Sequence, residues 1–472
     1  MSWRRMAETV FGAGMLAVVP AMAVAAPADR HYVGPLASAT QINAERLAMR
    51  LVADPRIVAL RPQLRAIVRA LPAAGSPSGA QQIDHSIDEW TMSLAIREIC
   101  SDTAHPAISW HPENSPHNWF GYTFPGSGIA GDNPDRIYRG TFLDGASTYE
   151  VRGSFPSKRS VQFSLEAIRG TPGGIGMTHQ SSATPDMGNQ IAILEDVNMD
   201  VAENGTFVVT IGPESADAGR NHMKLTPGPV NLVVRDTLSD WAEEPTVVEI
   251  RRLSGPAAKA PPTEKELVDR LVTDLPEWVR FWANFNTAWL GGLKDNQIKG
   301  PAPREGGWGY LAAGRFNLTD QDAIVITTTD MGAKATGFQI TNPWMIMPGD
   351  ARKALLSLNK GQVARNPDGS VTYVLSRRDP GVANWIDTGG LAQGIFILRW
   401  EGVSRDADPG AWIRGFQKLN LADLKGALPP GVPMLGKAER AAQISARESD
   451  YDLRLGKKVD RVAAGTPAPA VR

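Results

Sequence analysis

The chain has 472 residues, which is too many for one small domain and enough for two or three. With 49 Lys and Arg against 50 Asp and Glu, its net charge of −1 excludes a broadly basic surface of the kind that binds nucleic acid. A single cysteine excludes an internal disulfide, so packing and hydrogen bonds alone must stabilise the fold.

The first 25 residues have the pattern of a signal peptide. Arg4 and Arg5 supply a positive segment, residues 10–24 are mostly apolar, and Ala23-Val24-Ala25 fits a cleavage site. Because the apolar segment is short and interrupted by glycine, the pattern predicts cleavage rather than membrane anchoring. We therefore expect a soluble periplasmic or secreted protein without a membrane span, and ordinary secretion is favoured over twin-arginine export.

Residues 40–104 are predicted to form a helical cap on a β domain. Apolar residues recur mostly at three- and four-residue steps from Leu47 to Leu71, and Pro55 and Pro62 interrupt the run. A Pro/Gly/Ser segment then precedes a second amphipathic helix that ends near Cys100. We interpret the Cys100 thiol as buried and structural rather than nucleophilic.

The period of the apolar residues changes to two between residues 118 and 255, which predicts a first β-sandwich unit. Tyr149 and Val151 point to one face of a strand, and Asn204-Gly205 is a hairpin-type turn before the strand that contains Phe207. Alternation of this kind is typical of antiparallel sheets with one buried face.

Residues 261–299 are predicted to form a helical hairpin inserted between two β units. Thr263 and Glu266 have the spacing of a capping box, and the leucines and aromatics that follow, up to Trp289, recur with helical spacing. This aromatic face is expected to pack across a sheet, with an interface to a partner as the lesser alternative.

Residues 301–403 repeat the plan of the first unit. The segment 368–375 matches 204–211 in turn chemistry and strand character, and the strand that ends at Arg399 matches the strand that ends at Arg235. Each match alone is short, but their common order predicts an internal duplication of two β units.

Together these patterns predict a mainly β fold, with two related antiparallel β-sandwich units, an N-terminal helical cap and a helical insertion between the units. Two sheets can bury both inner faces, which fits the alternating segments. Residues 404–472 are expected to form a C-terminal extension that contains a surface helix and a disordered tail.

Several motifs resemble those of the DUF1214 family, a group of uncharacterised bacterial proteins. They are DPGVANWIDTGG at 379–390 with the apolar strand that ends in Arg399-Trp400, together with Ile340–Trp344, Ser357–Asn359 and Gly131–Tyr138. The resemblance covers roughly residues 119–402. It implies that the sandwich units are of jelly-roll type, and it implies no established reaction.

Two segments offer metal-ligand chemistry without a complete motif. His105, His111 and His117 stand six residues apart among prolines, but neither cysteine ligands nor an HExxH helix accompanies them. Residues 196–200 alternate oxygen ligands as a calcium loop does, but they lack its sixth-position glycine and twelfth-position glutamate. Structural histidines and a solvated turn are the preferred interpretations, so no metal or other cofactor is predicted, and calcium stays an open alternative.

No G-x-S-x-G elbow, P-loop or dinucleotide fingerprint is present, which disfavours α/β-hydrolase catalysis, phosphoryl transfer and nicotinamide chemistry. What remains is a set of carboxylates, amides, arginines and tryptophans. The candidate catalytic residues are Asp379, Asp387 and Asp132. The candidate ligand-binding residues are Asn342, Trp344, Arg378, Asn384, Trp385, Asn133 and Arg136.

This set favours recognition of a glycan, or of a similar polyhydroxy or aromatic small molecule. Sugar C–H faces stack on indole rings, sugar hydroxyls need acid and amide partners, and paired carboxylates can perform glycosidic acid/base chemistry. The two hypotheses are an exported enzyme that acts on such a ligand and a non-catalytic periplasmic module that binds a ligand or a partner. The sequence does not predict the oligomeric state.

The enzyme hypothesis requires at least two of the three candidate acids to share a concave pocket beside Trp385. We expect Trp344, Arg378 and Trp385 to wall one cavity, with Asp379 or Asp387 as its charged group. The competing interpretation is that the acids only form turns, because Asp-Pro-Gly explains itself by turn geometry, and that the tryptophans only fill a core.

Overall fold

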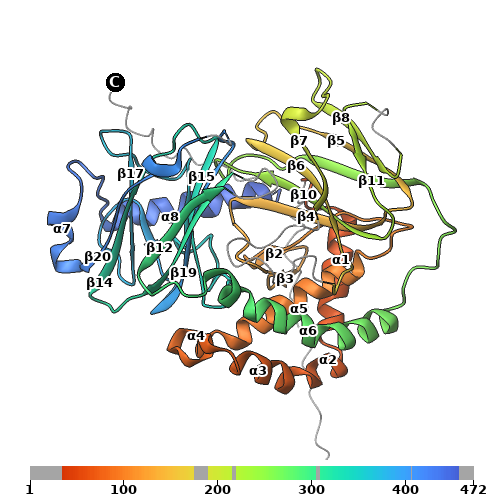
Figure 1. Ribbon diagram of the computed structural model, residues 1–472, viewed down its shortest axis with the longest axis horizontal. Coiled ribbons are helices and arrows are strands. Elements are labelled where there is room, and N and C mark those ends of the chain that lie inside the picture. The colour runs from red at the N-terminus through yellow and green to blue at the C-terminus, as the bar shows by residue number, and fades with distance from the viewer. Residues whose placement is uncertain (1–33, 175–189, 215–218, 304–308, 405–406, 457–472) are drawn as a thin grey trace, which may run out of the picture.

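The computed structural model describes residues 34–174, 190–214, 219–303, 309–404 and 407–456 (Figure 1). The predicted signal peptide and the predicted disordered tail lie outside the described residues. The helices are α1 (Ala39–Val52), α2 (Pro55–Ala59), α3 (Arg61–Arg69), α4 (Pro77–Gln81), α5 (Ile83–Ile99), α6 (Glu264–Leu290), α7 (Leu424–Ala427) and α8 (Lys437–Arg454). None of these described helices is long and apolar enough to cross a membrane.

Two sheets form the first β unit. One has five strands, in the order β1 (Ser109–Trp110), β4 (Arg136–Asp144), β10 (Pro229–Thr237), β6 (Gln162–Arg169) and β7 (Gln190–Glu195). The other has four, in the order β11 (Val247–Ser254), β5 (Thr148–Ser154), β8 (Thr206–Gly212) and β9 (His222–Lys224). A short hairpin of β2 (His117–Trp119) and β3 (Tyr122–Phe124) lies beside them.

The second unit has the same composition. Its five-stranded sheet has the order β12 (Gln297–Pro303), β13 (Tyr310–Asn317), β19 (Gln393–Glu401), β15 (Ala335–Thr341) and β16 (Ser357–Asn359). Its four-stranded sheet has the order β20 (Ile413–Asn420), β14 (Asp322–Thr328), β17 (Val371–Ser376) and β18 (Trp385–Asp387).

Strand for strand, the two units share one topology. In each unit the strands follow the same sheet order, and a parallel pair stands at the same edge, β8 with β9 in the first unit and β17 with β18 in the second. The other strand pairs are antiparallel. The predicted mainly β fold with two related antiparallel sandwich units is therefore confirmed, and the units lie side by side in Figure 1.

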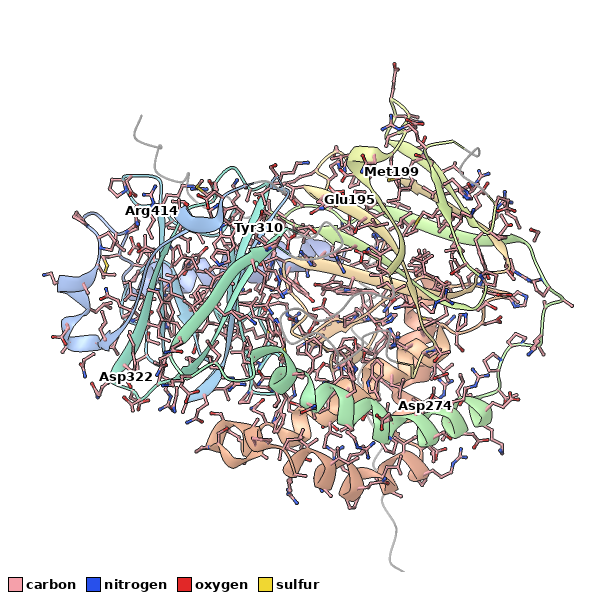
Figure 2. All side chains as sticks on the ribbon, viewed as in Figure 1. Glu195, Met199, Asp274, Tyr310, Asp322 and Arg414 are labelled. Carbon is pink, nitrogen blue, oxygen red and sulfur yellow. The ribbon has the colours of Figure 1, made fainter. Side chains whose placement is uncertain are left out.

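Side chains fill the interior of each sandwich (Figure 2). The labelled residues Asp322 on β14 and Arg414 on β20 mark the two outermost antiparallel strands on one side of the second unit. Since β20 pairs with β14, the second unit extends well past the predicted boundary at residue 403. That boundary was wrong because residues 413–420, which form β20, are mostly exposed and show little apolar alternation.

The predicted helical hairpin at 261–299 is also wrong. The segment forms one continuous helix, α6, which begins with the predicted capping box of Thr263 and Glu266 and contains Pro276. An interior proline removes one helical hydrogen bond. Burial of the aromatic face, which includes Trp278 and Trp282, outweighs that loss and keeps the helix intact.

The helices α1 to α5 correspond to the predicted cap of residues 40–104, and α6, predicted as a separate insertion, packs with them in one core below both β units in Figure 1. The Trp278 indole on α6 donates a hydrogen bond to the Trp90 carbonyl on α5 at 3.0 Å, which fixes these two helices to each other. Cys100 is buried at the end of α5, and burial raises the pKa of its thiol to about 11, so the predicted structural role fits its environment.

The strand β19 is buried on both faces, and its residues alternate between two cores. Phe396 and Leu398 point into the second sandwich, whereas Ile395 and Ile397 pack toward the helical layer. Arg399 lies on the same face as Ile397 and is 7% exposed. The strand therefore places a buried guanidinium outside the sandwich, between the second unit and the rest of the molecule.

Helix α8 is attached through arginines, so it is not the surface helix that the sequence predicts. Arg440, Arg447 and Arg454 recur every seven residues, which places them on one helix face, and all three are buried. The Arg447 guanidinium donates to the Ala351 carbonyl at 2.8 Å and lies 4.2 Å from the Trp241 ring centre. The helix thus connects Trp241 of the first unit with the second unit.

The substitution Arg447→Ala should lower the free energy of unfolding by about 2–4 kcal/mol, because it leaves buried carbonyl and hydroxyl acceptors without their donor. Urea unfolding followed by fluorescence measures this. Lys437→Ala, at an exposed position on the same helix, is the control and should change the value by less than about 0.5 kcal/mol. Equal effects of the two substitutions would show that α8 is not held by its buried face.

Candidate functional site

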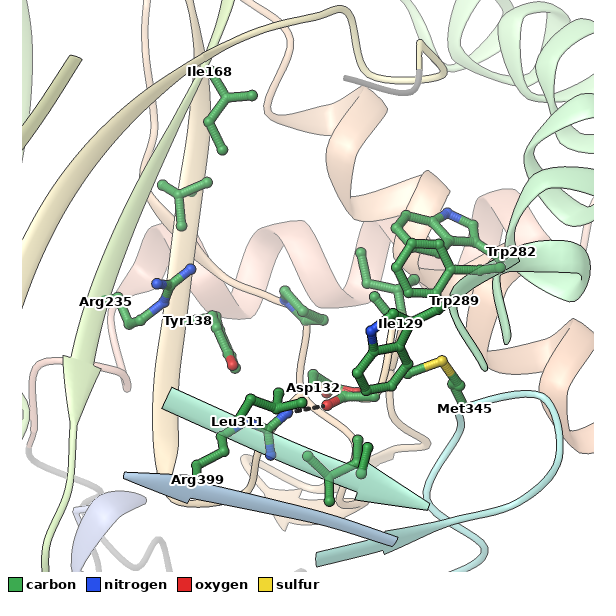
Figure 3. A pocket seen from close by; sticks show the side chains of 18 of the residues that line it. Ile129, Asp132, Tyr138, Ile168, Arg235, Trp282, Trp289, Leu311, Met345 and Arg399 are labelled. Atoms are coloured by element: carbon green, nitrogen blue, oxygen red, sulfur yellow. Dashed lines mark hydrogen bonds between the residues drawn. The ribbon is translucent and has the colours of Figure 1, made fainter. Parts of the chain in front are cut away.

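A cavity of about 240 Å³ lies between the five-stranded sheets of the two units, on the side closed by α6 (Figure 3). Each sheet turns one face into its own sandwich and the other toward this junction, so the cavity walls come from residues far apart in sequence. Its apolar lining includes Ile129, Ile168, Val233, Leu311, Met345 and Ile397. Its aromatic lining comes from Tyr138 on β4 and from Trp282, Phe285 and Trp289 on α6.

Arginines from both units surround one end of the cavity. Arg235 on β10 pairs with Glu166 on β6 at 2.8 Å, and Arg139 on β4 pairs with Asp236 at 2.5 Å. Burial lowers the pKa of both guanidinium groups, while each neighbouring carboxylate favours the charged form. These two cations therefore have their charge compensated within the first unit.

Arg399 has no such partner. In the described part of the chain, no carboxylate lies within 4.0 Å of its guanidinium. Its Nη2 donates to the Gly131 carbonyl at 2.9 Å, Nη1 donates to the Gln339 side-chain oxygen, and the buried Nε has no hydrogen-bond partner among the described residues. Burial lowers the pKa of Arg399 to about 10, so at neutral pH the group stays a buried cation.

Asp132 faces the same end of the cavity. It is 7% exposed, and its Oδ1 has no hydrogen-bond partner in the part of the structure that is described. Burial raises the pKa of Asp132 well above 3.8, and the neighbouring Glu113 acts in the same direction. The nearby Arg399 cation acts in the opposite direction, but the net shift of the Asp132 pKa favours the neutral acid, which can donate a hydrogen bond.

Two further carboxyl groups lie behind Asp132. Burial raises the pKa of Glu89, whose Oε2 accepts a hydrogen bond from the Gly128 amide at 2.6 Å. Burial also raises the pKa of Glu113, which accepts a hydrogen bond from the Tyr451 hydroxyl at 2.6 Å. An added Cβ at Gly126 would lie 2.5 Å from Glu89, so this glycine is needed for the close approach of its loop to that carboxyl group.

Tyr138 completes the polar end. Burial opposes ionisation of its phenol, but Arg136, Arg235 and Arg399 outweigh that effect and lower its pKa. In Figure 3 its hydroxyl points into the cavity, on the side of Arg399 and Asp132. A phenol, a guanidinium and a carboxyl group thus line the same end of the cavity, and together they can bind one oxygen-bearing group.

Of the three predicted catalytic acids, only Asp132 lines the cavity. Asp379 accepts a hydrogen bond from the Gly381 amide at 2.8 Å and pairs with Arg440 of α8 at 2.9 Å. Asp387 accepts from the Gly389 amide at 3.0 Å, and burial raises its pKa. Both therefore form turns, as the competing interpretation of the sequence had it. The Asp379 charge also helps to raise the pKa of Asp387, so these two acids lie near each other, but neither of them lines the cavity.

The predicted wall of Trp344, Arg378 and Trp385 is not formed. The Trp344 indole donates to the Gly79 carbonyl of α4 at 2.8 Å, within the helical core. Arg378 reaches the Asp320 carbonyl at 2.8 Å in an exposed setting. The Trp385 indole donates to the Ser376 carbonyl at 3.0 Å, and Arg440 lies 5.4 Å from its ring centre. The three side chains thus have separate surroundings.

The remaining predicted ligand-binding residues form internal hydrogen bonds. Asn342 accepts from the Trp344 and Ile346 amides, and Asn384 bonds the Ala364 amide and carbonyl. Asn133 accepts from the Asp135 amide at 3.0 Å. Arg136 forms a buried ion pair with Glu401 of the second unit, so it lies close to the cavity and joins the two units.

The histidines at 105, 111 and 117 occupy different environments. His105 bonds Asp102, His111 is buried near the Ser109 carbonyl, and His117 bonds Glu45. Asp196, in the calcium-like segment, pairs with Arg159. Within the described ranges, no group of three His, Cys, Asp or Glu side chains comes together as metal ligands would.

Sequence reasoning missed Arg399, Tyr138 and Trp282 as site residues. Arg399 stands in an apolar strand that reads as buried, and a charged residue in such a strand is itself a signal of a special environment. Trp282 belongs to the predicted aromatic face of α6, but sheet packing explained that face without a cavity. Tyr138 ends one of the motifs that resemble the DUF1214 family, Gly131–Tyr138, but nothing in that motif marks it as a site residue.

Comparison with known proteins bears on the fold. No protein-family model matches the chain, and no curated protein matches it. Among solved structures, an uncharacterised protein from Burkholderia cenocepacia is similar with a TM-score of 0.60 and 21% identity, over 79% of this chain and 99% of that one. The VPA0106 protein from Vibrio parahaemolyticus aligns with a TM-score of 0.36 and 14% identity, over 71% and 99%. The first likeness establishes a shared fold, and the DUF1214 resemblance stays a prediction.

The substitution Asp379→Asn should lower the free energy of unfolding by about 1–2 kcal/mol, because it removes the charge of a partly exposed carboxylate that pairs with the buried Arg440 guanidinium. Asp387→Asn should cost less than about 0.5 kcal/mol, because an amide oxygen still accepts from the Gly389 amide. Urea unfolding measures both. A larger loss of stability in Asp387→Asn than in Asp379→Asn would contradict this assignment of the two turns.

The substitution Asp132→Asn should flatten the pH dependence of stability. Because the folded pKa lies above 3.8, the folded chain keeps a proton that the unfolded chain loses, so the free energy of unfolding falls as pH rises from about 4 toward the raised pKa. Urea unfolding at about pH 5 and pH 8 should show a smaller fall for the variant, with Glu89 and Glu113 supplying the rest.

Asp368→Asn is the matched control for this measurement. Hydrogen bonds from Ser370 lower the pKa of this exposed carboxylate, so it is ionised in both the folded and unfolded chain over that pH range. Its replacement should leave the slope unchanged. An Asp132→Asn slope equal to that of the wild type would mean that Asp132 is ionised in the folded protein.

Proposed function

We propose that this protein binds a small, mostly apolar molecule in the cavity between its two β units. The observation that supports the proposal is the cavity itself, about 240 Å³ in volume, with aliphatic and aromatic walls and polar groups gathered at one end. Ligand sites are commonly of this kind, with an apolar wall that supplies affinity and a few convergent polar groups that supply orientation.

The character of the wall favours an apolar or aromatic ligand over a glycan. Sugar hydroxyls need polar partners along their length, whereas Ile168, Val233 and Trp289 offer apolar surface. Each ligand methylene buried against such a surface contributes about 0.8 kcal/mol. Of the ligand classes that the sequence suggests, an aromatic small molecule therefore fits this cavity better than a glycan.

Binding without catalysis is the form of the proposal that the geometry supports best. Among the described residues, a single carboxyl group, Asp132, lines the cavity, and glycosidic acid/base chemistry needs two. With residues 1–25 acting as a signal peptide, the ligand would be bound outside the cytoplasm. The proposal thus corresponds to the ligand-binding alternative from the sequence, moved to a different site.

The neutral fluorescent probe N-phenyl-1-naphthylamine should bind the full chain saturably. Ile129→Trp, which adds an indole to the cavity wall, should weaken that binding at least about tenfold, because the added ring occupies the space of the ligand. Fluorescence titration measures the affinity, and a thermal melt confirms that the variant is folded.

Val208→Trp, at a position on β8 that is 44% exposed, is the matched control and should bind the probe as the wild type does. Leu311→Trp, on another part of the wall, should repeat the effect of Ile129→Trp. Saturable binding that none of the wall substitutions changes would place the ligand elsewhere, and absence of binding would overturn the proposal.

A further inference from the structure

We propose that the ligand of this cavity carries a carboxylate group, which Arg399 binds with Tyr138 and Asp132 beside it. The inference rests on the proposed function and narrows the class of ligand. It depends on three features of the junction: the unused donors of Arg399, a difference between the two duplicated units, and the partners of the other cations around the cavity.

Arg399 presents donors that the protein does not use. A guanidinium has five N–H groups. Two of them reach the Gly131 carbonyl and the Gln339 side chain, while the buried Nε has no partner among the described residues. Asp132 Oδ1 and Trp282 Nε1, which line the same cavity, are also buried without a hydrogen-bond partner in the described part of the chain. Buried polar groups without partners are costly, and acceptor oxygens on a ligand would satisfy these donors.

At one equivalent position the two units carry different side chains, and this difference leaves the Arg399 charge without a carboxylate partner. Arg235 on β10 and Arg399 on β19 occupy equivalent places in the two units. In each unit, the residue two positions before the arginine pairs across the sheet with a residue whose side chain contacts that arginine. In the first unit that side chain is Glu166, opposite Val233, and in the second it is Gln339, opposite Ile397. The duplicated position thus holds a carboxylate in one unit and a neutral amide in the other.

The other cations among the described lining residues are paired with a carboxylate, bonded to carbonyl groups or exposed. Arg235 pairs with Glu166 and Arg139 pairs with Asp236. Arg97 donates to the Thr171 and Pro172 carbonyls and lies over the rings of Phe142 and Trp278. Lys299 is exposed. Among the described lining residues, Arg97 and Arg399 are thus the buried cations without a carboxylate partner, and of these Arg399 is the one beside Tyr138 and Asp132. A single such charge at the polar end suits a monoanion better than a doubly charged phosphate.

The groups beside Arg399 fit a carboxylate. A guanidinium binds the two oxygens of a carboxylate through parallel N–H bonds. The Tyr138 hydroxyl points into the cavity on the same side in Figure 3, and the Asp132 carboxyl group can donate as well when it is protonated. The apolar wall on the far side leaves the rest of the ligand in contact with aliphatic and aromatic surface. The expected ligand is therefore an aromatic or aliphatic carboxylic acid.

Calorimetric titration of the full chain with 1-naphthylacetate and 1-naphthylacetamide tests the inference, because the two compounds share a shape and differ in charge. The wild type should bind the acid at least about tenfold more tightly than the amide. Arg399→Gln should remove that preference while leaving the affinity for the amide within about threefold. A purely structural role of Arg399 would instead lower both affinities together, which would overturn the inference.

Arg378→Gln is the matched control, since Arg378 is exposed and does not line the cavity, and it should keep the preference for the acid. The wild-type comparison needs no variant, so the test stands even where Arg399→Gln fails to fold. If the neutral probe binds but the acid is not preferred over the amide, the carboxylate inference is wrong and the cavity proposal stands. If neither the probe nor either naphthyl compound binds, both are wrong.

Discussion

The ion pair between Arg136 of the first unit and Glu401 of the second is the interaction on which the junction depends. Both side chains are buried, and the pair joins two sheets whose facing surfaces carry several arginines. A buried cation is tolerated only where hydrogen bonds or opposite charge replace its hydration. The junction is therefore organised as a layer of arginines, each with its own set of acceptors.

Duplication explains why this layer exists at all. Each unit is a sandwich whose five-stranded sheet has an inner face in its own core and an outer face turned to the other unit. A strand such as β19 must then satisfy two environments, and it does so by alternating Phe396 and Leu398 with Ile397 and Arg399. Helix α6 covers the gap that remains, and its aromatic rings make that gap apolar.

The sequence predicts the fold well because the fold follows local rules. Alternating apolar residues, the Asn204-Gly205 turn and the capping box at Thr263 each act over a few residues, and the order of the strands repeats. The hairpin at 261–299 was wrong because Pro276 has a local cost that a long packed face overcomes. Helix α8 was wrong because arginines read as exposed, whereas this helix buries them.

The candidate site was predicted poorly because it has no local signature. Asp379 and Asp387 attract attention beside glycines and tryptophan, but an aspartate two residues before a glycine amide forms a turn by itself. The cavity instead joins β4, β10, β13, β19 and α6, and which faces meet is decided by packing between units. Asp132 was identified only as one acid among three, without the burial that sets it apart.

In the binding proposal, the difference between Glu166 and Gln339 gives one unit of a duplicated frame a binding site without new architecture. A glutamate and a glutamine have nearly the same shape, so each can accept a hydrogen bond from an arginine two residues along the neighbouring strand. The geometry of the strands is kept and only the charge changes. In the first unit the Glu166 carboxylate pairs with Arg235, so this arginine has a structural role. The second unit holds Arg399 with neutral acceptors, so its positive charge and its remaining N–H groups stay directed at the cavity.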